Sequence, residues 1–147
     1  MSVLDVLLIV IDVILLCLFG VALSSVVNFF LSSQGQISAV GTMVSSTYGF
    51  ISGAYMPISQ FPEALQKVIA FMPGTYGTVL VRNHAMRGII AEMKEDGLPE
   101  EFILEVKDSF DCNLYFFDNK VSTPVLYIVI GGTVVLLIAL YVLMNIL

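Results

Sequence analysis

The class of this protein is decided by residues 13–62, VILLCLFGVALSSVVNFFLSSQGQISAVGTMVSSTYGFISGAYMPISQFP, which contain no Asp, Glu, Lys or Arg. Residues 121–147 form a second uncharged block, and 16 of the 18 charged residues lie between the blocks. Of all residues, 58% are hydrophobic and 12% are charged, about half the charged fraction of a typical globular domain. This composition predicts an all-α integral membrane protein with one membrane domain, residues 1–147. The net charge of −6 argues against a nucleic-acid partner.

Three segments are long enough to cross a membrane as helices. About 20 helical residues cross the roughly 30 Å of hydrocarbon in a bilayer. The polar residues 32–36 interrupt the longer uncharged block with a turn. We therefore predict transmembrane helices at residues 8–31 and 37–56. A third is predicted at residues 124–146, with Pro124 in its first turn.

Small side chains recur at helical spacing along the second predicted span. They are Gly41, Ser45, Gly49 and Gly53, and the last two form a GxxxG pair that allows another helix to approach closely. We interpret them as a helix-packing surface. The alternative is that small residues are simply common in membrane helices.

Prolines divide the segment after the second span into short helices. One helix is predicted at residues 62–72, and a second at residues 75–88, capped by Thr75 and ended by Gly88. Both are too short to cross a bilayer. We expect residues 57–88 to form a re-entrant helical hairpin, or to lie at the membrane interface.

The segment that follows, residues 89–123, is an acidic and amphipathic loop. A helix is predicted at residues 99–110, because Glu100 and Glu101 in its first turn suit the helix dipole. We expect a small, solvent-facing helical loop.

The run FISGAYMPISQFPEALQKVIAFMPGTYGTVLVR, residues 50–82, resembles the segment after the fifth membrane helix of type-2 ABC transporter permeases, the membrane subunits of drug-resistance-like bacterial exporters. The matching positions are Gly53, Pro57, Pro62, Pro73, Thr75 and Arg82. The hydropathy on either side fits the last three of the six spans in that family. The resemblance implies the C-terminal half of an ABC-2 permease, whose re-entrant motif forms an outer gate.

The resemblance also implies a function and a set of partners. The chain would form part of the translocation path of an ATP-driven exporter of drugs or lipids in the bacterial plasma membrane. A second permease subunit, identical or different, would pair with it, and an ABC ATPase would bind ATP and Mg²⁺. Residues 57–123 would lie outside the cytoplasm. All Lys and Arg residues lie in this region, so the positive-inside rule by itself would place it in the cytoplasm. That rule is weak for loops longer than about 60 residues, and we follow the resemblance.

No enzymatic activity is expected of this chain, and no cofactor. It has no GxxxxGK[ST] loop, so ATP would be bound by the partner ATPase. Membrane lipids are a further expected partner. The alternative to an exporter subunit is a small membrane scaffold or regulatory protein that transports nothing. A membrane-embedded enzyme is the weakest hypothesis, because no catalytic constellation is evident.

Several polar residues have two interpretations each. Asp12 is costly inside a bilayer. It either lines a substrate or proton pathway or lies at the interface, and we favour the interface. His84 has no second His or Cys nearby, so a metal site is not expected. Arg87, like Arg82, binds acidic groups or snorkels to the interface. Tyr48 lines an outer vestibule or belongs to an aromatic belt.

The two cysteines, Cys17 and Cys112, lie in different predicted environments, one in a span and one in the charged segment. A disulfide needs its two Cα atoms within about 7 Å. We therefore predict two free thiols.

Overall fold

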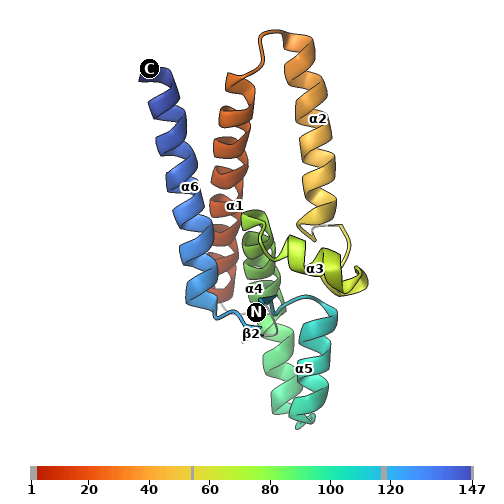
Figure 1. Cartoon of the computed structure of the whole chain (residues 1–147). Helices are drawn as coiled ribbons and strands as arrows, with labels where there is room; N and C mark the ends of the chain where they lie inside the picture. Colours follow the sequence, from red (N-terminus) through yellow and green to blue (C-terminus); the bar gives the residue numbers. More distant parts are fainter. Residues whose placement is uncertain (1–2, 54, 117–118, 147) are drawn as a thin grey trace.

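The computed structural model of the chain consists mainly of helices and describes residues 3–53, 55–116 and 119–146. Residue 54 of the predicted second span and residues 117–118 of the predicted acidic loop lie outside the described residues. The elements, shown in Figure 1, are α1 (Val3–Phe29), α2 (Gln34–Ile51), the 3-10 helix η1 (Ile58–Gln60), α3 (Glu63–Ile69), α4 (Pro73–Glu95), α5 (Glu100–Ser109), β1 (Tyr115–Phe116), β2 (Asn119–Lys120) and α6 (Thr123–Ile146).

The core forms where α1, α4 and α6 pack against one another. Its buried side chains come from all three helices and from the segment before β1; they are Phe19, Tyr76, Val79, Leu80, Leu114, Leu126, Ile130 and Val134. Helix α2 contributes no buried residue. In Figure 1 it leans away from α1, with α3 between its lower end and α4. The turn from α1 to α2 and the C-terminal end of α6 lie at one end of the molecule, and α5 lies at the other.

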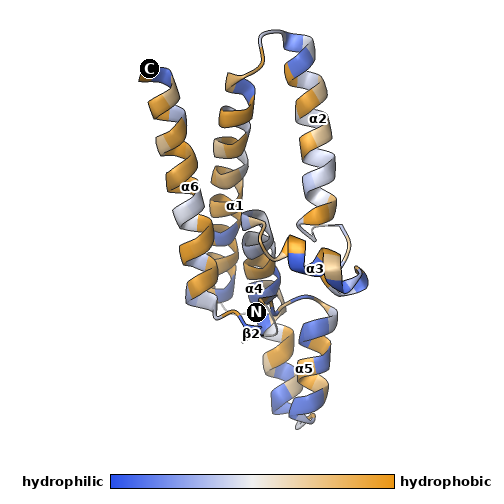
Figure 2. Cartoon of the chain, in the orientation of Figure 1, coloured by the Kyte–Doolittle hydropathy of each residue, from blue (hydrophilic) through white to orange (hydrophobic). Residues whose placement is uncertain are grey.

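Two helices, α1 and α6, are long and apolar enough to cross a membrane. Figure 2 shows both as largely hydrophobic, while α5 and the lower part of α4 carry many hydrophilic residues. Large apolar side chains of α1 and α6, such as Leu7, Ile14 and Val135, point away from the protein and are exposed. Lipid is the solvent that such surfaces fit. Helix α2 has 18 residues, about 27 Å at 1.5 Å per residue, and ends before the predicted residue 56.

Helix α1 begins at Val3 rather than at residue 8. The helix therefore includes Asp5, which the predicted span left out, as well as Asp12, which lay inside that span. Both carboxylates are buried and both have cationic or polar partners elsewhere in the chain. These contacts allow the helix to include them.

The predicted boundaries between residues 62 and 95 are wrong in two places. Helix α3 has only seven residues, and α4 is one helix of 23 residues that begins at Pro73, a residue with no N–H to leave unsatisfied. Thr75 lies inside α4 rather than capping it. Gly88 also lies inside α4, and the glycine with left-handed backbone is Gly97, at φ +74°, just after the helix ends.

Helix α5 confirms the predicted helix at residues 99–110, with Pro99 before its first residue. Among its apolar side chains, Ile103 is buried, whereas Phe102 and Phe110 are exposed. The short antiparallel pair of β1 and β2 was not predicted. Two-residue strands leave no periodic pattern in a sequence.

Candidate functional site

Helix α4 enters the core after a chain reversal at residues 70–76, where α3 ends and α4 begins. Gly77 allows α4 to lie close to α1 and α6. A β-carbon there would lie 2.5 Å from Ile130 Cδ1 and 2.7 Å from Leu16 Cδ1. Leu16 is in the middle of α1, so the first turns of α4 lie beside the middle of a long apolar helix (Figure 1).

Side chains satisfy the backbone groups of this reversal. The Tyr48 hydroxyl of α2 accepts a hydrogen bond from the Gly74 N–H at 3.0 Å. The Tyr76 hydroxyl donates to the Ala70 carbonyl oxygen at 2.8 Å. A buried backbone group without a partner is costly, and it is most costly in an apolar environment. These contacts therefore let the chain reverse among apolar helices.

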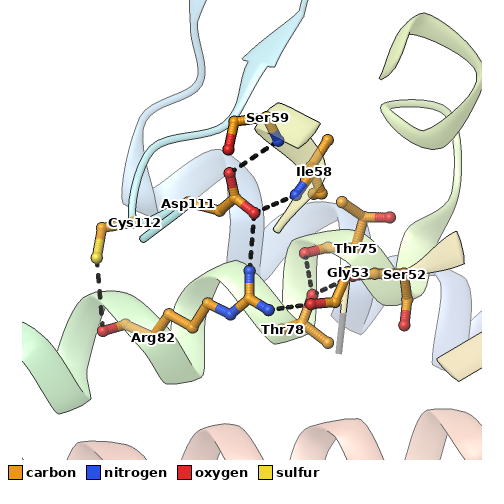
Figure 3. A network of polar contacts seen from close by, with 9 residues as sticks. All are labelled: Ser52, Gly53, Ile58, Ser59, Thr75, Thr78, Arg82, Asp111 and Cys112. Carbon is orange, nitrogen blue, oxygen red and sulfur yellow. Dashed lines mark hydrogen bonds and ion pairs between the residues drawn. The ribbon is translucent and has the colours of Figure 1, made fainter. Parts of the chain in front are cut away.

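Arg82 and Asp111 form a clamp around the loop that follows α2, drawn in Figure 3. Arg82 Nη1 lies 3.0 Å from Asp111 Oδ2, and the other guanidinium nitrogen donates to the Gly53 carbonyl oxygen. Asp111 also accepts hydrogen bonds from the N–H groups of Ile58 and Ser59. The clamp thus joins α4, the start of η1 and the segment after α5. We name it the Arg82–Asp111 clamp.

Sequence reasoning identified only one side of this clamp. Gly53 and Arg82 belong to the predicted gate motif, and the structure brings them together. Asp111 was not singled out, because it is one of several acidic residues in its segment. The signal that distinguishes it, a left-handed backbone at φ +49°, exists only in three dimensions.

The three prolines of the predicted gate motif lie at or just before the starts of helices. Pro57 precedes η1, Pro62 precedes α3, and Pro73 is the first residue of α4. Thr75 donates its hydroxyl hydrogen to the Ile69 carbonyl oxygen at 3.0 Å, which ties the end of α3 to the start of α4.

The predicted small-residue surface of α2 lines a cavity of about 280 Å³ between α2 and α1. Gly41, Ser45 and Gly49 lie on one side and Phe19 on the other. A β-carbon at Gly41 would meet nothing within 4 Å, and Gly53 lies beyond the end of α2. A β-carbon at Gly49 would clash with Cε2 of Tyr55, a residue beyond the end of α2.

Asp12, which we predicted at the membrane interface, lies in a buried polar cluster within the protein. It is 1% exposed. Its Oδ2 lies 2.5 Å from His84 Nδ1, and its Oδ1 accepts a hydrogen bond from the Tyr127 hydroxyl at 2.5 Å. We name Asp12, His84 and Tyr127 the Asp12 cluster. Towards the start of α1, Arg87 Nε lies 3.5 Å from Asp5 Oδ1.

The Asp12 cluster was only partly visible in the sequence. An acidic residue at the edge of an uncharged block marked Asp12 for attention. His84 and Tyr127 are 72 and 115 residues away along the chain, and no spacing rule connects them.

Cys112 is buried at 1% exposure and Cys17 is exposed, and both are free thiols, as predicted. Burial raises the pKa of the Cys112 thiol, while the positive charges of Lys107 and Arg82 act in the opposite direction. The Asn83 amide donates to the Cys112 carbonyl oxygen at 3.0 Å. These contacts add to the clamp in joining α4 to the segment after α5.

A second cavity, of about 420 Å³, lies between α3 and the residues that precede and form β1. Lys67, Asp108, Asn113 and Tyr115 are among its lining residues. Tyr115 donates its hydroxyl to Asp108, and burial, together with this contact, raises the pKa of the phenol. The cavity is lined by side chains of positive and of negative charge, so its charge does not favour one class of ligand.

The described residues contain no group of three or more His, Cys, Asp or Glu side chains that could hold a metal ion. Comparison with known proteins gives no match, since no protein family, no curated protein and no solved structure is significantly similar to the chain. The structure itself establishes a mostly helical chain with two helices that could cross a membrane.

Proposed function

We propose that the chain is a membrane-spanning permease subunit, equivalent to the C-terminal half of an ABC-2 type transporter. It would form part of the translocation path and outer gate of an ATP-driven exporter. In this proposal α1, α2 and α6 are the three spans, and residues 57–88, which comprise η1, α3 and the first part of α4, are the re-entrant hairpin. The observation that carries the proposal is the chain reversal before α4, whose backbone groups are satisfied by side chains.

The physical basis is the cost of irregular backbone at membrane depth. Such backbone is tolerated only where protein or water satisfies its polar groups. Tyr48, Tyr76 and Arg82 supply partners to the carbonyl and N–H groups of the loop after α2 and of the reversal. A soluble arm hanging below the membrane would not need these contacts, because water could replace them.

The loose position of α2 supports an assembly of several subunits. It has no buried residue, and its small side chains face a cavity rather than a packed helix. We propose that a second permease subunit, or a complementary half, completes the bundle there. The ATP and Mg²⁺ of the transport cycle would be bound by an ABC ATPase at the opposite end from residues 57–123.

The proposed location is the bacterial plasma membrane, with residues 57–123 outside the cytoplasm. This side can be tested in a chain whose two cysteines are replaced, Cys17→Ala and Cys112→Ala. Glu95→Cys then introduces a thiol at the exposed end of α4, and Gln34→Cys introduces one at the exposed start of α2 as the matched control. We expect a membrane-impermeant maleimide to label Glu95→Cys in intact cells and Gln34→Cys only after permeabilisation. The reverse pattern would contradict the proposed topology.

The proposed function itself is tested by the partners of the full chain. The chain should be tagged in its native host, extracted in mild detergent and examined for a co-purifying subunit with a Walker-type ATP site. We expect that subunit to hydrolyse ATP in the complex, and transport of drugs or lipids to depend on it. A chain that never associates with an ATPase would instead support a scaffold or regulatory role. The neighbouring reading frames provide a simple first check.

A further inference from the structure

The Asp12 cluster joins one side chain from each helix of the core. Asp12 comes from α1, His84 from α4 and Tyr127 from α6. Asp12 and His84 are 1% and 6% exposed. No step of the proposed transport function uses this cluster, so its chemistry needs a separate explanation.

We take Asp12 as ionised, and this charge sets the tautomer of a neutral His84 ring in the contact. An ionised carboxylate only accepts hydrogen bonds, so the contact between Asp12 Oδ2 and His84 Nδ1 requires a proton on Nδ1. The Tyr127 hydroxyl donates a hydrogen bond to the other carboxylate oxygen, Asp12 Oδ1. The unprotonated nitrogen of the neutral ring is therefore Nε2, because the tautomer follows from the hydrogen bond that the other nitrogen makes.

The second ring nitrogen, Nε2, is open to a proton. Every fully buried side-chain nitrogen and oxygen in the described part of the chain has a hydrogen-bond partner. For the His84 ring, the hydrogen bond in that part is made by Nδ1. It follows that Nε2 is not fully buried.

The charge balance favours a cluster that can take up one proton. With a neutral ring, the cluster carries the single negative charge of Asp12. Arg87 of α4 pairs with Asp5 of α1, Arg82 of α4 pairs with Asp111, and α6 contains no charged residue. A buried charge that is paired costs less than one that is not. Proton binding and close packing of the three helices therefore support each other.

We infer that Asp12, His84 and Tyr127 form a proton-binding site that couples the protonation of His84 to the packing of α4 between α1 and α6. In the binding step, one N–H bond forms at Nε2, the proton comes from water, and the Asp12 carboxylate balances the new positive charge. Tyr127 keeps its proton throughout. The inference rests on the contacts of the cluster and stands whether or not the chain belongs to an exporter.

The first test uses the fact that His84 is the single histidine of the chain. Labelling with ¹⁵N-histidine makes the ring nitrogens of the full chain, in lipid nanodiscs, directly observable by NMR. We expect both nitrogens to be protonated at acidic pH, and only Nδ1 after one proton is lost. A neutral ring that carries its proton on Nε2, or ¹⁵N shifts that do not change with pH, would overturn the inference.

The second test measures the coupling to packing. Hydrogen exchange of the α4 backbone N–H groups at residues 75–84, corrected for its intrinsic pH dependence, should be roughly three- to tenfold slower with the ring protonated. Asp12→Asn and His84→Gln should remove this difference, since no balanced ion pair can then form. Equal protection in both states of the wild-type chain, or an unchanged difference in Asp12→Asn, would overturn the coupling.

Two further variants make the result specific. Lys94→Gln removes an exposed charge from α4 outside the cluster and should retain the pH-dependent protection. Tyr127→Phe removes one hydroxyl and keeps the Asp12–His84 contact, so its neutral ring should still carry the proton on Nδ1. Loss of the pH-dependent protection in Lys94→Gln would contradict the assignment to His84. The wild-type measurements decide the tautomer and the pH dependence even if a variant fails to fold.

Discussion

Arg82 and Asp111 form an ion pair of 3.0 Å across 29 residues of sequence, and this contact holds the loop after α2 against α4. Their side chains are 24% and 6% exposed. Asp111 also accepts hydrogen bonds from two backbone N–H groups of η1, so a single carboxylate organises three segments. The stability of this end of the molecule should depend strongly on that carboxylate.

Replacing Asp111 with Asn should lower the free energy of unfolding by about 3 kcal/mol, because the partly buried Arg82 loses its counter-charge. Unfolding by heat or denaturant in detergent micelles provides the measurement. Glu105→Gln removes an exposed carboxylate from α5 and is the matched control, expected to stay within about 0.5 kcal/mol of the wild type. Equal effects of the two substitutions would contradict the clamp.

Gly77→Ala should destabilise the chain by about 1–3 kcal/mol, because the new methyl group meets the side chains of Ile130 and Leu16. Gly132→Ala is the matched control on α6, where a β-carbon meets nothing within 4 Å. The higher helix propensity of Ala should make that variant equal to the wild type or up to about 1 kcal/mol more stable. Combining Gly77→Ala with Ile130→Val should recover part of the loss, and no recovery would argue against this contact.

Tyr48→Phe should cost about 1–3 kcal/mol, because the Gly74 N–H loses its hydrogen-bond acceptor at the chain reversal. Hydrogen exchange at Gly74 should become faster in the same variant. Tyr55→Phe removes a phenol hydroxyl from a side chain that is 71% exposed, and should have little effect. An unchanged exchange rate at Gly74 would show that Tyr48 does not protect the reversal.

The stability of the folded chain should decline at alkaline pH, in part through Cys112. Burial raises the pKa of this thiol, so the unfolded chain loses the thiol proton at a lower pH than the folded chain does. The contribution is complete below the ordinary thiol pKa and disappears as pH rises through the folded value. Free energies of unfolding measured from neutral pH to about pH 10 should show the decline, and Cys112→Ala should reduce its slope. An identical slope in both chains would contradict the burial of Cys112.

The spacing of apolar and charged residues determined most of the helical elements. Residues 13–62 and 121–147 carry no charge, and helices are the elements that satisfy their own backbone in an apolar environment. Helix α5 also followed from local signals, since Glu100 and Glu101 mark its first turn. Local composition was a poorer guide to boundaries. Gly88 is of a residue type that is common just after a helix ends, but it lies inside α4, which continues to Glu95.

The contacts between distant segments were decided by tertiary structure alone. The sequence marks Asp12 as a carboxylate beside an uncharged block, but only the fold supplies its partners, His84 and Tyr127. Asp111 is one acidic residue among many until the backbone turns at it and aims its carboxylate at Arg82. The physical reason is that hydropathy and helix propensity act over a few residues along the chain. Charge pairing and hydrogen bonding instead act between whichever groups the fold brings within about 3 Å of each other.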